Sequence, residues 1–337
     1  MKTAVVWDPA YLEHEMGGHP EGADRLSHIL AYLEASDLWP RLSVVSPHAA
    51  TVDDLLTVHT RNYIDVVRQA AASGGRWLDP DTYVSPRSFD IALLAAGGGL
   101  DALGGFEPGE VRFALVRPPG HHALPDRAMG FCLFNNIAIA ARRLLAEGVE
   151  RIAIVDWDVH HGNGTQAAFI DEPRVLFCSL HQWPLYPGSG WFNECGEGDG
   201  EGYTVNVPLP PGSRDGDYAR AFDEIVGPIV DLYEPQAVLV SAGQDPHTDD
   251  PLASMSLTED GFAWLARFVQ ELAQRHCDGR LALFLEGGYE RTATSRSVAA
   301  IVRALLDETA AEVGGESGRA AAAIEQALRV QRAYWQI

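Results

Sequence analysis

The chain has 337 residues, 46% of them hydrophobic, and a mean hydropathy of −0.08, which is typical of an ordinary globular protein. Its 47 acidic and 25 basic residues give a net charge of −22, so nucleic acid is a poor candidate partner. No stretch approaches the ~18 consecutive apolar residues of a membrane-spanning helix, and the acidic Asp8 comes too early for a signal peptide. We therefore expect a cytoplasmic protein that has no membrane partner.

Short apolar runs alternate along the chain with amphipathic stretches of helical length, as in parallel α/β folds. No repeat, linker or change of composition marks a boundary, so we expect one domain over residues 1–337. Its predicted architecture is an open, mostly parallel sheet with helices on both faces. The strands are expected at Thr3–Trp7, Arg112–Val116, Ile152–Asp156, Val175–Leu180, Tyr203–Val207, Ala237–Ser241 and Leu281–Leu285. The helices are expected at Asp24–Leu33, Asn62–Ala72, Arg87–Leu103, Asn135–Ala146, Tyr218–Leu232, Thr258–Arg275, Thr294–Asp307 and Arg319–Leu328.

The four cysteines lie far apart and form no Cys-x-x-Cys pair, which argues against disulfides and against a thiolate zinc site. We expect them to be reduced and mostly buried. They are Cys132, Cys178, Cys195 and Cys277.

Ligands of parallel α/β sheets bind beyond the carboxyl ends of the strands, so polar residues that follow strands are the candidate site. The strongest signal is the strand that ends in Asp156-Trp-Asp158-Val-His160-His161-Gly. Side chains alternate along an extended chain, so Asp156, Asp158 and His160 should share one side, where carboxylates and an imidazole suit a metal ion. Asp245, after a second strand, is placed to supply a third ligand.

Two further strand ends carry residues suited to catalysis. His121 and His122 follow one strand, and histidine can act as a general base near neutral pH. Glu286-Gly287-Gly288-Tyr289 follows the last strand, where the tyrosine could donate a hydrogen bond to an oxyanion. Taken separately, each of these motifs is also compatible with a structural role.

Taken together and in this order, the motifs resemble the histone deacetylase superfamily. The tryptophan between Asp156 and Asp158, Asn163 and the Glu-Gly-Gly-Tyr289 ending look like its class II branch and the bacterial histone deacetylase-like and acetylpolyamine amidohydrolases. The resemblance runs from Gly18 to Tyr289. It implies an arginase/deacetylase-like fold and hydrolysis of acylated amines with Zn²⁺, for which Fe²⁺ or Co²⁺ could substitute because two ligands are carboxylates.

The resemblance also assigns roles to individual residues. Asp158, His160 and Asp245 match the zinc ligands. His122, oriented by Asn163, matches a general base and later general acid, and His121, oriented by Asp156, its electrostatic partner. Tyr289 matches the oxyanion donor.

The remaining assignments concern the substrate tunnel and a structural ion. Phe131, after Gly130, and Tyr186 match tunnel walls, although both could be ordinary core aromatics. Asp156 and Ser179 resemble a structural K⁺ site. Arg25 matches an arginine of an internal acetate channel, but a cation on a surface helix is an equal alternative. Gln244 and Pro246 depart from the pattern usual around the third ligand.

Three functions stay open at this stage. Deacylation of acetyl-lysine or a similar acylated small amine leads, because a polyamine-selective relative would place an acid where this chain has Leu252. An acetylpolyamine amidohydrolase is the alternative, which the charge of −22 favours because that substrate is cationic. The third is a catalytically silent metalloprotein that binds an acylated ligand. Oligomeric state is open, and a homo-oligomer is compatible with the sequence.

Overall fold

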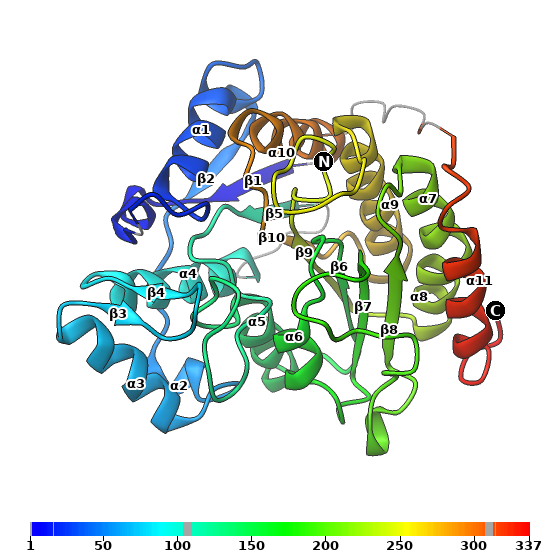
Figure 1. Ribbon diagram of the computed structural model, residues 1–337, viewed down its shortest axis with the longest axis horizontal. Coiled ribbons are helices and arrows are strands. Elements are labelled where there is room, and N and C mark those ends of the chain that lie inside the picture. Colours follow the sequence, from blue (N-terminus) through cyan, green and yellow to red (C-terminus); the bar gives the residue numbers. More distant parts are fainter. Residues whose placement is uncertain (1, 16, 104–109, 307–312, 314) are drawn as a thin grey trace.

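A single eight-stranded sheet runs through the molecule, and all of its strands are parallel (Figure 1). The computed structural model describes residues 2–15, 17–103, 110–306, 313 and 315–337. Across the sheet the strand order is β2-β1-β5-β10-β9-β6-β7-β8. The strands are β1 (Lys2–Val6), β2 (Ser43–Val45), β5 (Glu110–Ala114), β6 (Ile152–Asp156), β7 (Val175–Gln182), β8 (Thr204–Leu209), β9 (Ala237–Ala242) and β10 (Leu281–Leu285), and an antiparallel pair is formed by β3 (Arg76–Trp77) and β4 (Tyr83–Val84).

Helices cover both faces of the sheet, as expected from the alternation of strand and helix. On one face α10 packs between α1 and α9, and on the other α4 packs against α5 (Figure 1). The α-helices are α1 (Ala23–Glu34), α2 (Val52–Leu55), α3 (Arg61–Ala72), α4 (Ser88–Leu103), α5 (Asn136–Ala146), α6 (Asn163–Ala168), α7 (Asp215–Ala221), α8 (Gly227–Tyr233), α9 (Glu259–Cys277), α10 (Arg291–Leu305) and α11 (Ala321–Gln331). Five-residue and shorter turns complete the list: Pro9–Glu13, Trp39–Arg41 and Gly198–Gly200 are 3₁₀, and Phe222–Val226 is a π-helix.

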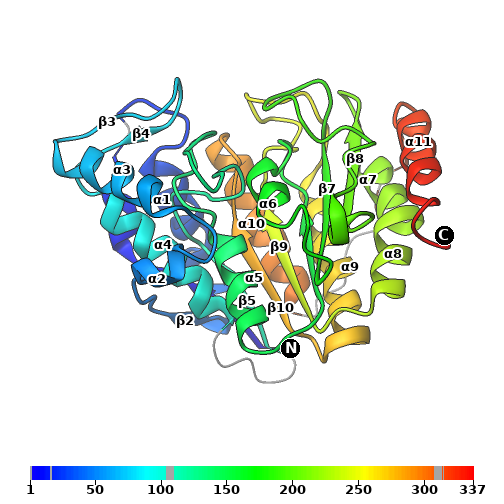
Figure 2. The ribbon, with the colours of Figure 1, turned by 90° about the horizontal axis from the view of Figure 1, so that it is seen from below.

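The central strands β6, β9 and β10 are apolar except for Asp156 and Ser241, as expected for strands with both faces covered. Every residue of β9 and of β10 is buried, and so is every residue of β6, including the terminal Asp156. The polar residues therefore begin where the strands end. In Figure 2 the loops that follow the strands rise at the top of the view, together with β3 and β4, while the N-terminus lies at the bottom.

The structure differs from the sequence-based expectation at several short elements and in one long helix, since β3, β4, α2 and α6 were not predicted. The edge strand β2 was not predicted, because it has only three residues and none of them is buried. The helix expected over Tyr218–Leu232 is divided into α7, a π-helical turn and α8. Pro228 explains this division, since it lacks the N–H that a continuous helix would use. The helix expected at Thr294–Asp307 is observed as α10 over Arg291–Leu305, and Asp307 lies outside the described residues.

The cysteines are buried as expected, and the C-terminal helix lies against the edge of the sheet. All four cysteines are free and buried. Helix α11 packs against the edge strand β8, and Trp335 Nε1 donates to the Gly202 carbonyl at 2.9 Å. Among the described residues, none of the helices has the length and apolar character needed to cross a bilayer. The cytoplasmic location and the oligomeric state stay predictions.

Candidate metal centre and active site

The three predicted metal ligands meet at the carboxyl ends of two neighbouring strands. Asp158 and His160 follow β6 and Asp245 follows β9, and these strands are paired in the sheet. Their ligand atoms all lie within 4.8 Å of one another, and all three residues are buried. Nδ1 of His160 lies 3.2 Å from Asp158 Oδ1 and 3.0 Å from Asp245 Oδ2. The cluster therefore offers two carboxylates and an imidazole to one point.

Asp156 is not part of this cluster, in contrast to the expectation from strand alternation. Strand β6 ends at Asp156, and the chain beyond it is a loop in which the two-residue period no longer applies. The Asp156 carboxylate instead accepts the Asp158 N–H at 3.0 Å and pairs with His121. Asp156 therefore stabilises the loop that carries Asp158 and His160 through a backbone hydrogen bond.

The charge of the cluster suits a cation. Burial and the neighbouring Asp158 raise the pKa of Asp245 to about 7, since two carboxylates face each other away from water. Burial alone would lower the pKa of His160, but the two carboxylates raise it to about 10. Both shifts show a deficit of positive charge, which a divalent ion would supply.

The loop after β10 needs glycine at position 287 for this cluster to form. A Cβ atom at Gly287 would lie 2.1 Å from Oδ2 of Asp245 and 2.6 Å from Oδ2 of Asp158. The Gly287 N–H donates to the same Asp158 oxygen at 2.8 Å. Backbone therefore approaches the carboxylates where no side chain fits.

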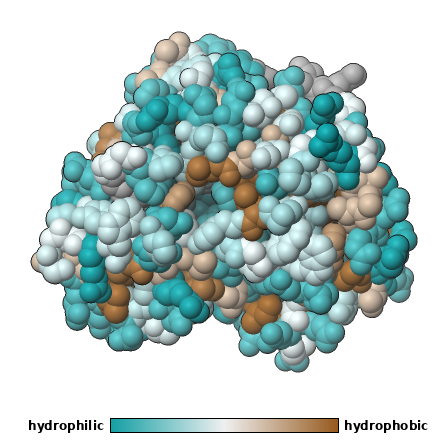
Figure 3. All heavy atoms as spheres, viewed as in Figure 1, coloured by the Kyte–Doolittle hydropathy of each residue, from teal (hydrophilic) through white to brown (hydrophobic). Residues whose placement is uncertain are grey.

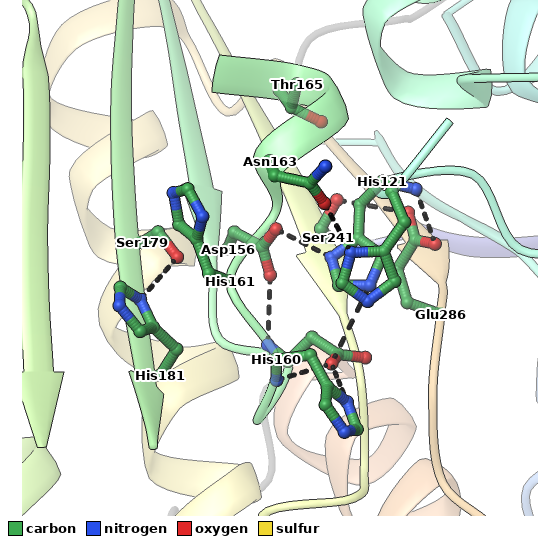
Figure 4. Close-up of polar contacts among 12 residues, drawn as sticks. His121, Asp156, His160, His161, Asn163, Thr165, Ser179, His181, Ser241 and Glu286 are labelled. Atoms are coloured by element: carbon green, nitrogen blue, oxygen red, sulfur yellow. Dashed lines mark hydrogen bonds and ion pairs between the residues drawn. The ribbon is translucent and has the colours of Figure 1, made fainter. Parts of the chain in front are cut away.

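The tandem histidines lie beside this cluster and have different hydrogen-bond partners; Figure 4 shows His121 with Asp156, and Asn163 near it. His121 Nδ1 donates to Asp156 Oδ2 at 3.0 Å, whereas His122 Nδ1 donates to the amide oxygen of Asn163 at 2.7 Å. Burial lowers the pKa of His121, but the carboxylates of Asp158 and Asp156 raise it well above its usual range. Burial and the adjacent His121 hold the pKa of His122 well below its usual range. His121 is therefore held as a cation and His122 as a neutral ring.

The carboxylate of Glu286 organises the turn that carries these histidines, a function that the sequence interpretation missed. It accepts the N–H groups of Gly120 at 2.7 Å and His121 at 3.1 Å, and the Ser241 hydroxyl at 3.1 Å. Burial raises its pKa to about 7. A carboxylate directly after the fully apolar β10 was the available signal.

A pocket of about 190 Å³ opens beside the cluster, and all four predicted substrate-binding residues line it. The hollow near the centre of the face in Figure 3 has hydrophobic residues along its border. The rings of Phe131 and Tyr289 meet edge to face at 5.7 Å, and Tyr186 meets His122 in the same way at 5.2 Å. The lining residues are Asp81, His122, Gly130, Phe131, His160, Leu185, Tyr186, Leu252 and Tyr289. Asp81 and Leu185 were not predicted, because neither belongs to a recognisable motif.

Arg25 is buried behind this pocket, so the alternative of a surface cation is wrong. Its guanidinium donates to the carbonyls of Glu286 and Gly288, both at 2.6 Å, and lies 4.8 Å from the centre of the Tyr289 ring. These contacts attach α1 to the loop that carries Tyr289.

The predicted K⁺ residues are neighbours in the sheet, where Asp156 pairs with Ser179 of β7. The Ser179 hydroxyl lies 3.0 Å from Nδ1 of His181, and the His181 and His161 rings are 4.8 Å apart (Figure 4). Among the described residues, the only group of three or more His, Cys, Asp or Glu side chains close enough to share a metal ion is Asp158, His160 and Asp245. The K⁺ site stays a prediction.

Comparisons with known proteins agree with this geometry. A model of the histone deacetylase domain matches residues 19–305. The chain is 47% identical over 294 residues to a "Probable deacetylase" of Archaeoglobus fulgidus, covering 86% of this chain and 82% of that protein. It is 42% identical over 276 residues to the "Histone deacetylase-like amidohydrolase" of Pseudomonas aeruginosa, covering 81% and 73%. The crystal structure of the HDA15 HD domain superposes with a TM-score of 0.92 at 37% identity, covering 99% of this chain and 95% of the other.

Proposed function

Since this chain belongs to the histone deacetylase family, we propose that it is a zinc-dependent deacylase that hydrolyses the amide of N-acetyl-lysine side chains or of similar acylated primary amines. One observation carries the proposal: a neutral, amide-supported His122 lines the same pocket as the metal-ligand residue His160 and the hydroxyl-bearing Tyr289. We also propose that residues 1–337 form one catalytic domain.

The residues that would hold the ion are Asp158, His160 and Asp245, and three protein ligands leave room for water and substrate. A bound Zn²⁺ would polarise the acyl carbonyl and lower the pKa of a coordinated water toward ~7. Fe²⁺ or Co²⁺ could serve in its place, since two of the ligands are carboxylates. We further propose a structural K⁺ beside Asp156 and Ser179.

His122 performs the proton transfers in this proposal. Its Nδ1–H is committed to Asn163, so Nε2 carries the free lone pair. Nε2 accepts a proton from the attacking water and later gives that proton to the departing amine as the C–N bond breaks. The products are a carboxylate and a free primary amine.

His121 and Tyr289 stabilise the negative charge that develops during this reaction. His121 is held as a cation by the carboxylates of Asp158 and Asp156, and it supplies fixed positive charge next to His122. Burial raises the pKa of the Tyr289 hydroxyl well above its usual range, so it remains a proton donor at neutral pH. A hydroxyl at this place can donate to the tetrahedral oxyanion, an interaction typically worth ~10²–10³ in turnover.

The pocket wall favours an acylated lysine stem. Phe131, Tyr186 and Leu252 give it apolar sides that suit a chain of methylene groups. Because Leu252 is uncharged, it offers no ion pair to the second ammonium group that a polyamine would carry.

N-acetylated polyamines are the second candidate, because a carboxylate does line the pocket elsewhere. Asp81 lies in its wall, where burial and the adjacent Asp79 raise its pKa to about 6. Together with the net charge of −22, it would attract a second ammonium group.

Hydrolysis of a fluorogenic acetyl-lysine peptide and of N-acetylated polyamines by the zinc-loaded protein tests the proposal. We expect turnover of the peptide, which Tyr289→Phe lowers by about 10²-fold or more. Turnover of polyamines alone, reduced in Asp81→Asn, would transfer the assignment to the second candidate. A protein that binds zinc and an acylated ligand but hydrolyses neither would be a silent binding protein.

A further inference from the structure

The buried carboxylate of Asp250 connects two walls of the pocket. It lies in the loop after β9, five residues beyond the ligand residue Asp245, and is only 6% exposed. Its Oδ1 accepts the N–H of Leu252 at 3.0 Å, within its own loop. Its Oδ2 accepts the N–H of Tyr289 at 2.6 Å and, more weakly, that of Glu290 at 3.4 Å, in the loop after β10.

The loop that carries Tyr289 needs such a restraint. Two consecutive glycines precede the tyrosine, and Gly288 has a φ of +118°, so this backbone has more conformational freedom than ordinary residues allow. Arg25 holds the loop by its carbonyl groups, those of Glu286 and Gly288. Asp250 holds the same loop by the N–H groups of Tyr289 and Glu290. The turn is therefore fixed between a buried cation and a buried anion.

We propose that Asp250 is a positioning residue that holds the Tyr289 hydroxyl at the reaction centre by accepting the backbone N–H of Tyr289. The inference rests on the proposed function, in which Tyr289 donates to the oxyanion. A charged acceptor makes a shorter and stronger hydrogen bond than a neutral one, which suits a contact that must fix a position. A displacement of about 1 Å at a reaction centre can cost on the order of 10²-fold in rate.

A merely structural role at the start of α10 is the competing explanation. That helix has its own N-cap, since the Glu290 side chain accepts the N–H of Ala293 at 2.6 Å. The contact from Asp250 to Tyr289 is therefore additional to what the helix needs. Its expected effect is on the rate of the chemical step.

Asp250→Ala and Asp250→Asn test the proposal, with Asp215→Ala as the matched control. Asp215 is 8% exposed and accepts the N–H and hydroxyl of Thr258 at 2.9 and 2.7 Å, without contact to Tyr289. We expect Asp250→Ala to lower kcat by about 10- to 100-fold with KM changed by less than about 3-fold. Asp250→Asn keeps one acceptor and should recover part of the rate. Asp215→Ala should lower the Tm while kcat stays within about 2-fold.

Combination with Tyr289→Phe decides whether Asp250 acts through the tyrosine. In the double variant Asp250→Ala/Tyr289→Phe, kcat should be no more than about 2-fold below that of Tyr289→Phe alone, because the hydroxyl to be positioned is already absent. Amide hydrogen exchange at Tyr289 should be faster in Asp250→Ala and unchanged in Asp215→Ala. Additive losses of kcat, or a wild-type kcat in Asp250→Ala while Tyr289→Phe is impaired, would overturn the proposal. Wild-type activity of Tyr289→Phe would instead refute the oxyanion role on which the proposed function depends.

Discussion

Two pairs of neighbouring histidines lie near the carboxyl ends of the strands, and they differ in the groups that support them. The rings of His121 and His122 are 4.0 Å apart, and those of His161 and His181 are 4.8 Å apart (Figure 4). All four are buried. In the first pair, His121 donates a hydrogen bond to the carboxylate of Asp156. The second pair has no carboxylate among its hydrogen-bond partners.

The second pair has only neutral partners. His161 contacts the Ser189 hydroxyl at 2.8 Å and the Gln166 amide oxygen at 2.9 Å. His181 contacts the Ser179 hydroxyl at 3.0 Å and the Gly190 carbonyl at 2.9 Å. Burial lowers the pKa of His161 to about 4 and holds that of His181 well below its usual range, so both rings are neutral. The carboxylates of Asp158 and Asp156 next to His121 thus distinguish a pair with one cationic and one neutral ring from a pair of two neutral rings.

The largest effect should come from removing the base itself. We expect His122→Ala to lower kcat by about 10²–10⁴-fold, the usual contribution of a general base. His181→Ala, an equally buried histidine of the other pair, should keep kcat within about 3-fold. Steady-state kinetics on the acetyl-lysine peptide compares them. Equal losses of kcat in the two variants would show that the hydrogen-bond partners of the rings do not decide which histidine takes part in the reaction.

A smaller effect should follow from giving His122 the support that His121 has. In Asn163→Asp, a carboxylate replaces the amide 2.7 Å from Nδ1 and raises the pKa of His122. The base must be neutral to accept a proton, so the acid limb of the profile of kcat/KM against pH should move to higher pH. At a pH below the acid limb we expect kcat/KM to fall by about 10- to 100-fold, the effect of a 1–2 unit shift, whereas well above the limb it should stay close to that of the wild type. An unmoved acid limb would contradict the assignment of His122 as the base.

In the second pair the effect should be on stability. His181→Ala leaves the Ser179 hydroxyl and the Gly190 carbonyl without their partner in a buried place. We expect the free energy of unfolding to fall by about 2–3 kcal/mol, measured by urea denaturation of the metal-loaded protein. A variant as stable as the wild type would show that this network does not hold its loop.

The smallest effect concerns His59, a neutral histidine outside both pairs. Its Nδ1 donates to the Leu124 carbonyl at 3.0 Å and its Nε2 accepts the N–H of Asn135 at 2.9 Å. Burial lowers its pKa from 6.5 to about 4. Below pH 6.5 His59 is protonated in the unfolded chain but stays neutral in the folded protein, so stability falls as the pH drops toward 4. This difference lowers the free energy of unfolding by about 2 kcal/mol between pH 7 and 5.

His59→Gln provides the comparison for that titration. It removes this ionisable group, so its free energy of unfolding should fall less steeply than that of the wild type between pH 7 and 5. Parallel pH dependences in urea denaturation would show that His59 is protonated to the same extent in both states.

The sequence predicted the fold and the centre of the site better than the supports around it. Strands such as β9 and β10 are fully buried, so their apolar composition predicts them from the sequence. The motifs that follow the strands predict the metal cluster and the tandem histidines. The edge strand β2 has no such signal. The role of Glu286 depends on N–H groups from a distant turn, and Asp81 reaches the pocket through a hairpin outside the sheet. Contacts of this kind arise only when the chain has folded.

Zinc titration of chelated protein tests whether hydrolysis depends on one metal ion held by Asp158, His160 and Asp245. Acetyl-lysine peptide turnover would be followed as Zn²⁺ is added to the metal-free wild type and to Asp245→Asn, with bound metal measured in parallel. The account predicts no turnover without metal, a rise that ends at one equivalent per chain, and weak binding with little turnover in Asp245→Asn. Undiminished hydrolysis by the metal-free protein would contradict it.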